Sequence, residues 1–166
     1  MNNRQPHNIE AEQSVIGAAF ISKSALQKVC EELDNTSFFN EAHGKIFDVL
    51  KELYQSGIAV DIMTVTDRLK SKKLLKEIGD VDYLLEIVNS VPTASNVDYY
   101  INIVREKAIL RNLIDTATNI VTEAYNETGS INETLDDAER KILNVVKNRK
   151  SSEFKPIQEA LSKAQL

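Results

Sequence analysis

The chain has 166 residues, of which 42% are hydrophobic and 27% charged, and a formal net charge of −5 at pH 7. This length can bury one or two small cores, and the acidic balance argues against broad phosphate binding as the main task of the segment. The single cysteine, Cys30, excludes an intrachain disulfide, and no basic, apolar leader follows Met1, so we expect a cytoplasmic protein. No apolar run approaches the roughly 20 residues of a membrane span, and we expect no membrane contact.

Helix start and stop signals divide the first part of the chain into about five to six short helices. The capping side chains and the glycines that punctuate these helices come in the order Asn8, Ser24, Asn40, Gly57, Asp61 and Gly79. Pro92 then disfavours helix at Val91. We therefore predict an all-α fold that begins with a globular helical head over residues 1–94.

Two longer helices are predicted after the head, over residues 97–125 and 131–147, with a turn at residues 126–130. A connection this short makes the two helices antiparallel neighbours. The first half of the earlier helix is apolar on a different face from its second half, so the first half is predicted to dock on the head. We predict a helical hairpin over residues 95–148, followed by a polar linker over residues 149–166.

Two apolar rows run along the earlier of these helices. One has the a/d spacing of a helix-helix seam and is predicted to close the hairpin: Leu110, Ile114, Ala117 and Val121. The later helix has an apolar row with the same spacing, which consists of Ile131, Leu135, Ala138, Ile142 and Val145. The other row finds no cover within the predicted hairpin and consists of Ile109, Leu113, Thr116 and Ile120. Because an apolar strip left in water marks an interface, this second row predicts self-association.

No catalytic, cofactor-binding or metal-binding motif is visible in the sequence. Gly44 and Lys45 are followed by Ile46 on a predicted helix, which does not match a phosphate-binding loop. His7 and His43 are far apart in the sequence and neither has the spacing of metal ligands, so structural roles are expected for both. We predict no catalytic residue, no cofactor and no metal in this segment.

The strongest candidate for nucleic-acid contact is a basic run that begins in the predicted fourth helix. It has five cations in nine residues and consists of Arg68, Lys70, Lys72, Lys73 and Lys76. These cations could contact phosphates, but no aromatic residue lies between them to stack on bases. A solvated helix face is the simpler interpretation of the run, and both interpretations remain open.

Several blocks of sequence, in a fixed order along the chain, carry a resemblance to a known family. The most specific blocks are N-I-E-A-E-Q at residues 8–13 and V-P-T-A-S-N-V at residues 91–97. A-H at residues 42–43 with K-I-F at residues 45–47, and D-A-E at residues 137–139, extend the match over almost the whole chain. Together these blocks strongly resemble the N-terminal domain of the bacterial replicative DNA helicases of the DnaB family.

The resemblance implies a cytoplasmic replication protein whose N-terminal domains pair through their hairpins. In this family the pairs assemble into a trimer of dimers, the collar of a hexameric ring, on which primase and, in many bacteria, a helicase loader dock. The parent protein is expected to be an ATP-dependent helicase that uses ATP and Mg and unwinds DNA 5′ to 3′. Its motor domain would follow the linker and would contact DNA through the ring, so the present segment is expected to have no enzymatic activity.

Family positions linked to primase or loader binding carry over to Glu10, Tyr83, Ile114 and Ile120, where this sequence has matching residues. The predicted function is therefore that of a collar domain, which mediates oligomerisation and the docking of partners. The alternative is a small helical DNA-binding replication adaptor that uses the basic run over residues 68–76.

Overall fold

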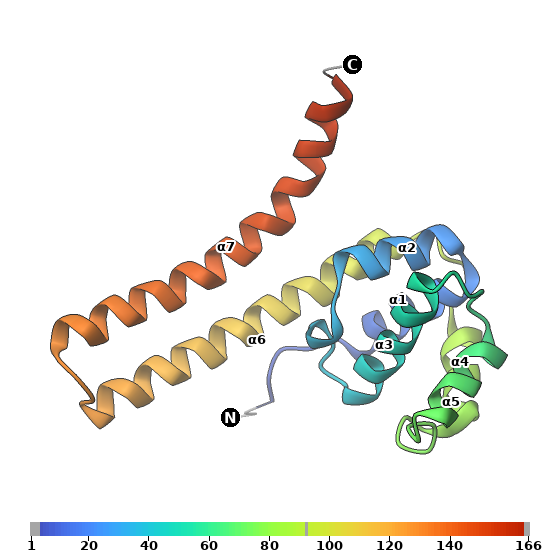
Figure 1. Ribbon diagram of the computed structural model, residues 1–166, viewed down its shortest axis with the longest axis horizontal. Helices are drawn as coiled ribbons and strands as arrows, with labels where there is room; N and C mark the ends of the chain where they lie inside the picture. The colour runs from blue at the N-terminus through green and yellow to red at the C-terminus, as the bar shows by residue number, and fades with distance from the viewer. Residues whose placement is uncertain (1–3, 92, 165–166) are drawn as a thin grey trace. The chain divides into compact units, whose positions relative to one another are not determined.

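The computed structural model describes residues 4–91 and 93–164, and over these residues the regular structure is entirely helical. The elements in chain order are α1 (Ile9–Ile21), α2 (Lys23–Glu32), the short 3-10 helix η1 (Asn35–Ser37), α3 (Glu41–Gln55), α4 (Ile62–Ser71), α5 (Asp80–Ser90), α6 (Val97–Asn126) and α7 (Ile131–Ala164) (Figure 1). The prediction of an all-α fold with a helical head and a long hairpin is confirmed. No helix in this described part of the chain is both long and apolar enough to cross a membrane.

Side chains cap most of the early helices, as the sequence predicts. The Asn8 carboxamide oxygen accepts a hydrogen bond from the backbone N–H of Ala11 at 2.9 Å, and Asn40 caps α3 in the same way. Asp61 and Thr64 form a reciprocal capping box at the start of α4. The second helix differs from the prediction, because its N-cap is Ser22 and the helix begins at Lys23.

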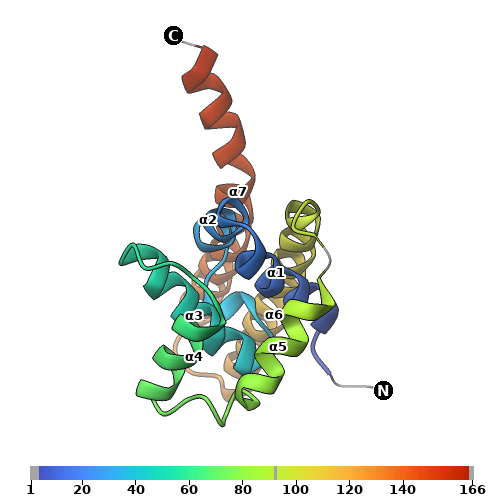
Figure 2. The same cartoon turned by 90° about the vertical axis from the view of Figure 1, so that its right-hand side faces the viewer.

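The chain divides into two compact units, Met1–Ala108 and Ile109–Leu166, so the boundary falls inside α6. In the first unit, α1 packs against α2, α3 and α5 (Figure 2). The first half of α6 adds Val97, Ile101 and Val104 to the same core. This unit, which we call the head, therefore extends past residue 94 and includes the α6 residues whose apolar face predicts docking. Its largest fully buried apolar side chains are Ile16, Ile46, Phe47, Leu50, Leu53, Leu69, Leu84, Ile87 and Ile101.

Gly17 sets how closely α1 approaches the end of α5. A Cβ atom at this position would lie 2.5 Å from Cγ2 of Val91 and 3.0 Å from the backbone oxygen of Ile87. We expect Gly17→Ala to lower the free energy of unfolding by about 1–3 kcal/mol, because the two helices must separate to admit the methyl group. Urea denaturation followed by circular dichroism measures this change, and an unchanged midpoint would contradict the close approach.

The second unit contains the rest of α6 and α7, which run antiparallel and are joined by a short turn (Figure 1). Gly129 takes a φ of +81° in the turn, and Ser130 and Glu133 form a capping box that starts α7. α7 then continues to Ala164. The structure therefore differs from the prediction that the hairpin helix ends near residue 147 and gives way to a linker over residues 149–166.

Candidate assembly and docking surfaces

The two apolar rows of α6 are exposed in the opposite way from the prediction. Leu110, Ile114 and Val121, predicted to close the hairpin, are 43%, 40% and 53% exposed, and Ala117 is also exposed. In the row predicted to face outward, only Leu113 is exposed, whereas Ile109, Thr116 and Ile120 are half-buried. The prediction of which row faces α7 is therefore wrong.

An ion pair shows which face of α6 lies toward α7. The Lys141 ammonium of α7 pairs with the Glu123 carboxylate of α6, and the pKa of Lys141 is raised, chiefly by its hydrogen bond to Glu123. Glu123 shares a helix face with Thr116 and Ile120, because residues three or four apart lie one above the other on a helix. The hairpin thus closes through a partly polar face of α6.

α7 shows the same separation between a covered and an uncovered face. Of its predicted seam residues, Val145 is buried and Ala138 half-buried, while Ile131 and Leu135 are 77% and 63% exposed. Ile142 is exposed as well. The covered positions of α7 lie on the same helix face as Lys141, and most of the larger apolar side chains are exposed to water.

The uncovered apolar residues of the two helices lie on one side of the hairpin. On a helix, successive residues are about 100° apart around the axis. On each of the two helices, the uncovered set is centred about 100° away from the face that meets the other helix, and the direction of this rotation is the same on both. Because the helices are antiparallel, the same rotation on each brings both sets to a single side. We call this surface the hairpin stripe; it consists of Leu110, Leu113, Ile114, Ala117, Val121, Ile131, Leu135, Ile142 and Val146.

In the head, a buried chain of polar side chains links α1, α3 and α5. Glu12 is 1% exposed and His43 is 0% exposed. The His43 Nδ1 atom lies 2.8 Å from the Glu12 carboxylate, and its Nε2 atom lies 2.6 Å from the hydroxyl of Tyr83. The Gln13 side-chain amide donates a hydrogen bond to the same hydroxyl, at 3.2 Å. We call these four residues the polar relay.

Glu12 has a second task within the polar relay, because its carboxylate also accepts the backbone N–H groups of Phe39 and Asn40 at 2.9 and 3.2 Å. These amides lie just before α3, so one buried carboxylate satisfies the start of that helix and the imidazole of His43 together. The expected structural role of His43 agrees with this geometry. Sequence reasoning missed the role of Glu12, because Glu12 has the position of an ordinary first-turn acid of α1.

The four residues that the resemblance links to partner binding lie in both units. Glu10 is exposed on the first turn of α1, and Tyr83 is half-buried on α5, where its hydroxyl is held by the polar relay. Ile114 belongs to the hairpin stripe, whereas Ile120 is half-buried on the face toward α7. Tyr83 is thus joined to groups that the sequence did not associate with it.

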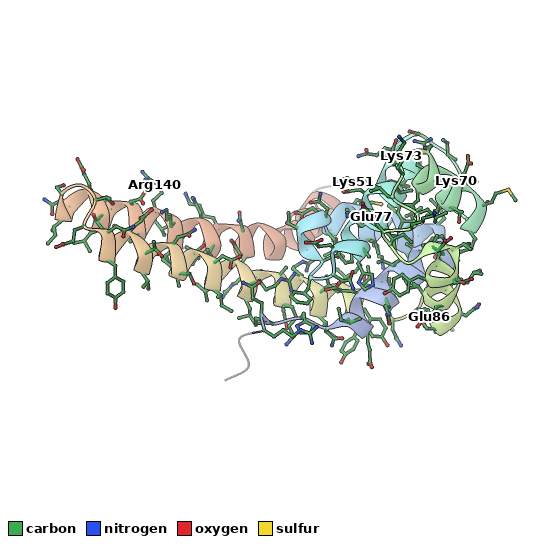
Figure 3. All side chains as sticks on the ribbon, turned by 90° about the horizontal axis from the view of Figure 1, so that it is seen from below. Lys51, Lys70, Lys73, Glu77, Glu86 and Arg140 are labelled. Carbon is green, nitrogen blue, oxygen red and sulfur yellow. The ribbon has the colours of Figure 1, made fainter. Side chains whose placement is uncertain are left out.

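The basic run is split by its contacts. Arg68 and Lys72 both pair with the Glu52 carboxylate of α3, the latter at 2.8 Å. Hydrogen bonds from Lys72 and Arg68 hold the pKa of Glu52 below its usual value. Lys70, Lys73 and Lys76 are exposed, and Figure 3 shows Lys70 and Lys73 at the surface of the head.

Among the described residues, no group of three or more His, Cys, Asp or Glu side chains is arranged to hold a metal ion. The Cys30 thiol is buried, which raises its pKa to about 11. The hairpin has an open hollow of about 420 Å³ near its turn, lined by charged and hydroxyl side chains that include Glu123, Asp137 and Arg140.

Comparison with known proteins finds replicative DNA helicases among the relatives of this chain. The chain is similar to the replicative DNA helicase DnaC of Bacillus subtilis (strain 168), with 43% identity over 162 residues that cover 97% of this chain and 36% of the relative. It is also 44% identical over 156 residues to the replicative DNA helicase DnaB of Geobacillus stearothermophilus, covering 94% of this chain and 34% of that protein. The chain therefore spans about a third of the length of these curated relatives.

The fold has solved counterparts as well. The crystal structure of the N-terminal domain of DnaB helicase from Mycobacterium tuberculosis matches with a TM-score of 0.81 and 38% identity, over 86% of this chain and 99% of that one. The same fold is found in a structure described as that of a DnaB-like replicative helicase and its interactions with primase. It matches with a TM-score of 0.68 and 24% identity, over 83% of this chain and 31% of that one. A family model described as the DnaB-like helicase N terminal domain matches residues 4–106. The chain therefore belongs to the family of DnaB-like helicase N-terminal domains.

Proposed function

We propose that this chain is the assembly and docking domain of a replicative DNA helicase, and that it pairs with a second copy of itself through the hairpin stripe. The observation that carries the proposal is one apolar surface formed by both helices of the hairpin. Single exposed apolar residues are ordinary on protein surfaces, but a contiguous strip of this kind marks an interaction site.

A second hairpin is the partner that fits this surface best. The stripe is two helices wide, and its residues recur at the three- and four-residue spacings of helix-helix packing. Pairing two such stripes about a two-fold axis would bury the same residues on both copies and give a four-helix arrangement. The charged residues Glu123, Asp137 and Lys141 engage each other instead and add no charge to the stripe.

Family membership supports the larger assembly that we propose. Three such pairs would form a trimer of dimers, the collar of a hexamer, and the parent protein would unwind DNA 5′ to 3′ with ATP and Mg in a separate motor domain. The present segment would contribute no catalytic group and no cofactor ligand. Its task would be to hold the ring together and to connect it with other replication proteins.

We propose primase and a helicase loader as those partners. A solved relative of the same fold is described with its interactions with primase, and Glu10 and Tyr83 are the matching positions on the head. Ile114 would be covered by pairing and Ile120 lies toward α7. Their influence on partner binding would then be indirect, through the geometry of the hairpins.

Measuring the mass of the chain in solution tests both parts of the proposal. Sedimentation equilibrium over a wide range of concentrations should show dimers and larger species, and adding the C-terminal domain of a primase should raise the mass further. A monomer at every concentration would contradict assembly. Assembly without any change on adding primase would leave pairing in place and contradict docking.

A further inference from the structure

The basic run has more positive charge than its contacts neutralise. Residues 68–76 contain five cations and no acid, in a chain whose net charge is −5. Glu52 is shared by Arg68 and Lys72, and Glu77, just after the run, pairs with Lys45 at 2.8 Å. Among the described residues, Lys70, Lys73 and Lys76 are exposed and take part in no ion pair of the structure. We call these three residues the lysine patch.

The lysine patch is held on a rigid base. The two ion pairs of Glu52 connect the last turn of α4 and Lys72, the residue after it, with α3. Leu69 is fully buried in the core, and Leu74 and Leu75 pack against it from the segment after α4. Figure 3 shows Lys70 and Lys73 at the surface of the head. The lysines at the end of α4 and in the segment just after it are therefore exposed together.

Lys73 occupies a backbone position that favours glycine. Its φ is +61°, and it follows the helix as the left-handed residue of a Schellman motif, in which the N–H of Leu74 bonds to the carbonyl of Leu69 at 2.9 Å. A side chain in this conformation is disfavoured relative to glycine. A lysine at this position therefore gives up some stability relative to glycine.

We propose that the lysine patch binds the phosphate groups of a nucleic-acid strand without reading its bases. Lysine charges alone suffice for phosphate contact, and no aromatic residue lies among residues 68–76 to stack on a base. A protein partner is the poorer fit, because stable protein interfaces have an apolar centre. The exposed residues between the lysines are polar, and the leucines of this segment face the core. The inference does not depend on pairing through the hairpin stripe.

Fluorescence anisotropy of a labelled oligothymidine, titrated with the whole chain at low salt, tests the proposal. We expect binding, and we expect the logarithm of the association constant to fall linearly with the logarithm of the salt concentration, with a slope of about 0.7 per phosphate contacted. Lys70→Glu combined with Lys73→Glu should weaken binding by about tenfold or more and make the salt dependence shallower. A duplex bound with the same dependence on these lysines would support phosphate recognition equally.

The matched control reverses two exposed lysines elsewhere, Lys23→Glu with Lys147→Glu, and changes the net charge by the same amount. It should leave the affinity within about twofold of the parent chain. An equal loss in both double variants would show that only net charge matters and would overturn the site. Absence of DNA binding, or binding only to a polyglutamate peptide, would overturn it as well, the latter in favour of an acidic protein partner.

Lys73→Gly separates a binding role from a structural one. Removing the side chain relieves the left-handed backbone, so the melting temperature should rise by a few degrees. The same substitution removes one phosphate contact and should weaken oligothymidine binding by several-fold. A more stable variant that binds with unchanged affinity would show that Lys73 only ends α4, and would exclude it from the lysine patch.

Discussion

Replacing Glu12 with alanine is expected to lower the free energy of unfolding of the head by about 3–5 kcal/mol. The carboxylate accepts hydrogen bonds from two backbone N–H groups, those of Phe39 and Asn40, and lies 2.8 Å from His43 Nδ1. Glu12 is 1% exposed and His43 is 0% exposed. Without the carboxylate, the buried His43 imidazole and the two backbone N–H groups lose their partner. The loss is a large part of the stability of an ordinary domain.

Glu10→Ala is the matched control for this prediction. Glu10 lies two residues earlier in the same first turn of α1 but is exposed. Its loss removes only a favourable charge near the helix N-terminus and should cost less than about 1 kcal/mol. Urea denaturation of both variants, followed by circular dichroism, gives the comparison. Equal, small losses would contradict the role given to the buried carboxylate.

Glu12→Gln refines the same test. The amide keeps one oxygen acceptor but places an NH2 group among the donors that surround Glu12. We expect the free energy of unfolding of Glu12→Gln to lie between those of the parent chain and of Glu12→Ala, because some hydrogen bonds survive. A glutamine variant as stable as the parent would mean that the negative charge has no part in holding α1, α3 and α5 together.

The helix starts were predictable because their causes are local. The caps at Asn8, Asn40 and Asp61 act within three residues of themselves, and sequence alone contains that information. The family was predictable for a similar reason, since its specific blocks are short and ordered. Polar composition and the family resemblance suggested a linker after residue 148, but polarity there indicates exposure to water without indicating a break in α7.

The polar relay could not be predicted, because it joins residues far apart in the sequence. His43 lies 31 residues from Glu12 and 40 residues from Tyr83. Their hydrogen bonds exist only after α1, α3 and α5 have packed together. In the sequence, Glu12 is one of two acids in a first helical turn, and nothing local distinguishes the buried one from the exposed Glu10.

The prediction assigned the wrong face of α6 to α7, and the error has a physical reason. Both apolar rows have spacings of three and four residues and are about 100° apart on the helix, so periodicity cannot choose between them. The choice is made by α7, through the pair of Glu123 with Lys141 and through small or polar residues such as Thr116 and Ala138. The larger side chains are left for another partner. Self-association stays a prediction, and the surface expected to mediate it changes.

Inserting a charge into the hairpin stripe is expected to abolish pairing while the chain stays folded. Ile114→Asp and Val121→Asp place a carboxylate at positions that are exposed in the single chain and buried between two copies. Each substitution occurs twice in a symmetric pair, and an unpaired buried charge costs about 3 kcal/mol or more. The dimer dissociation constant should therefore rise by about four powers of ten. Sedimentation equilibrium should give a monomer, with an unchanged circular dichroism spectrum.

Three further variants make this test specific to the hairpin stripe. Leu135→Asp should have the same effect from α7, because its residue shares that side of the hairpin. Asn119→Asp adds a carboxylate at an exposed position on the opposite side of α6 and should leave the dimer intact. Ile120→Asp should instead loosen the hairpin itself and lower its helix content, because Ile120 is half-buried on the face toward α7. Dissociation by Asn119→Asp, or unchanged dimers with Ile114→Asp, would show that copies of this chain meet through another surface.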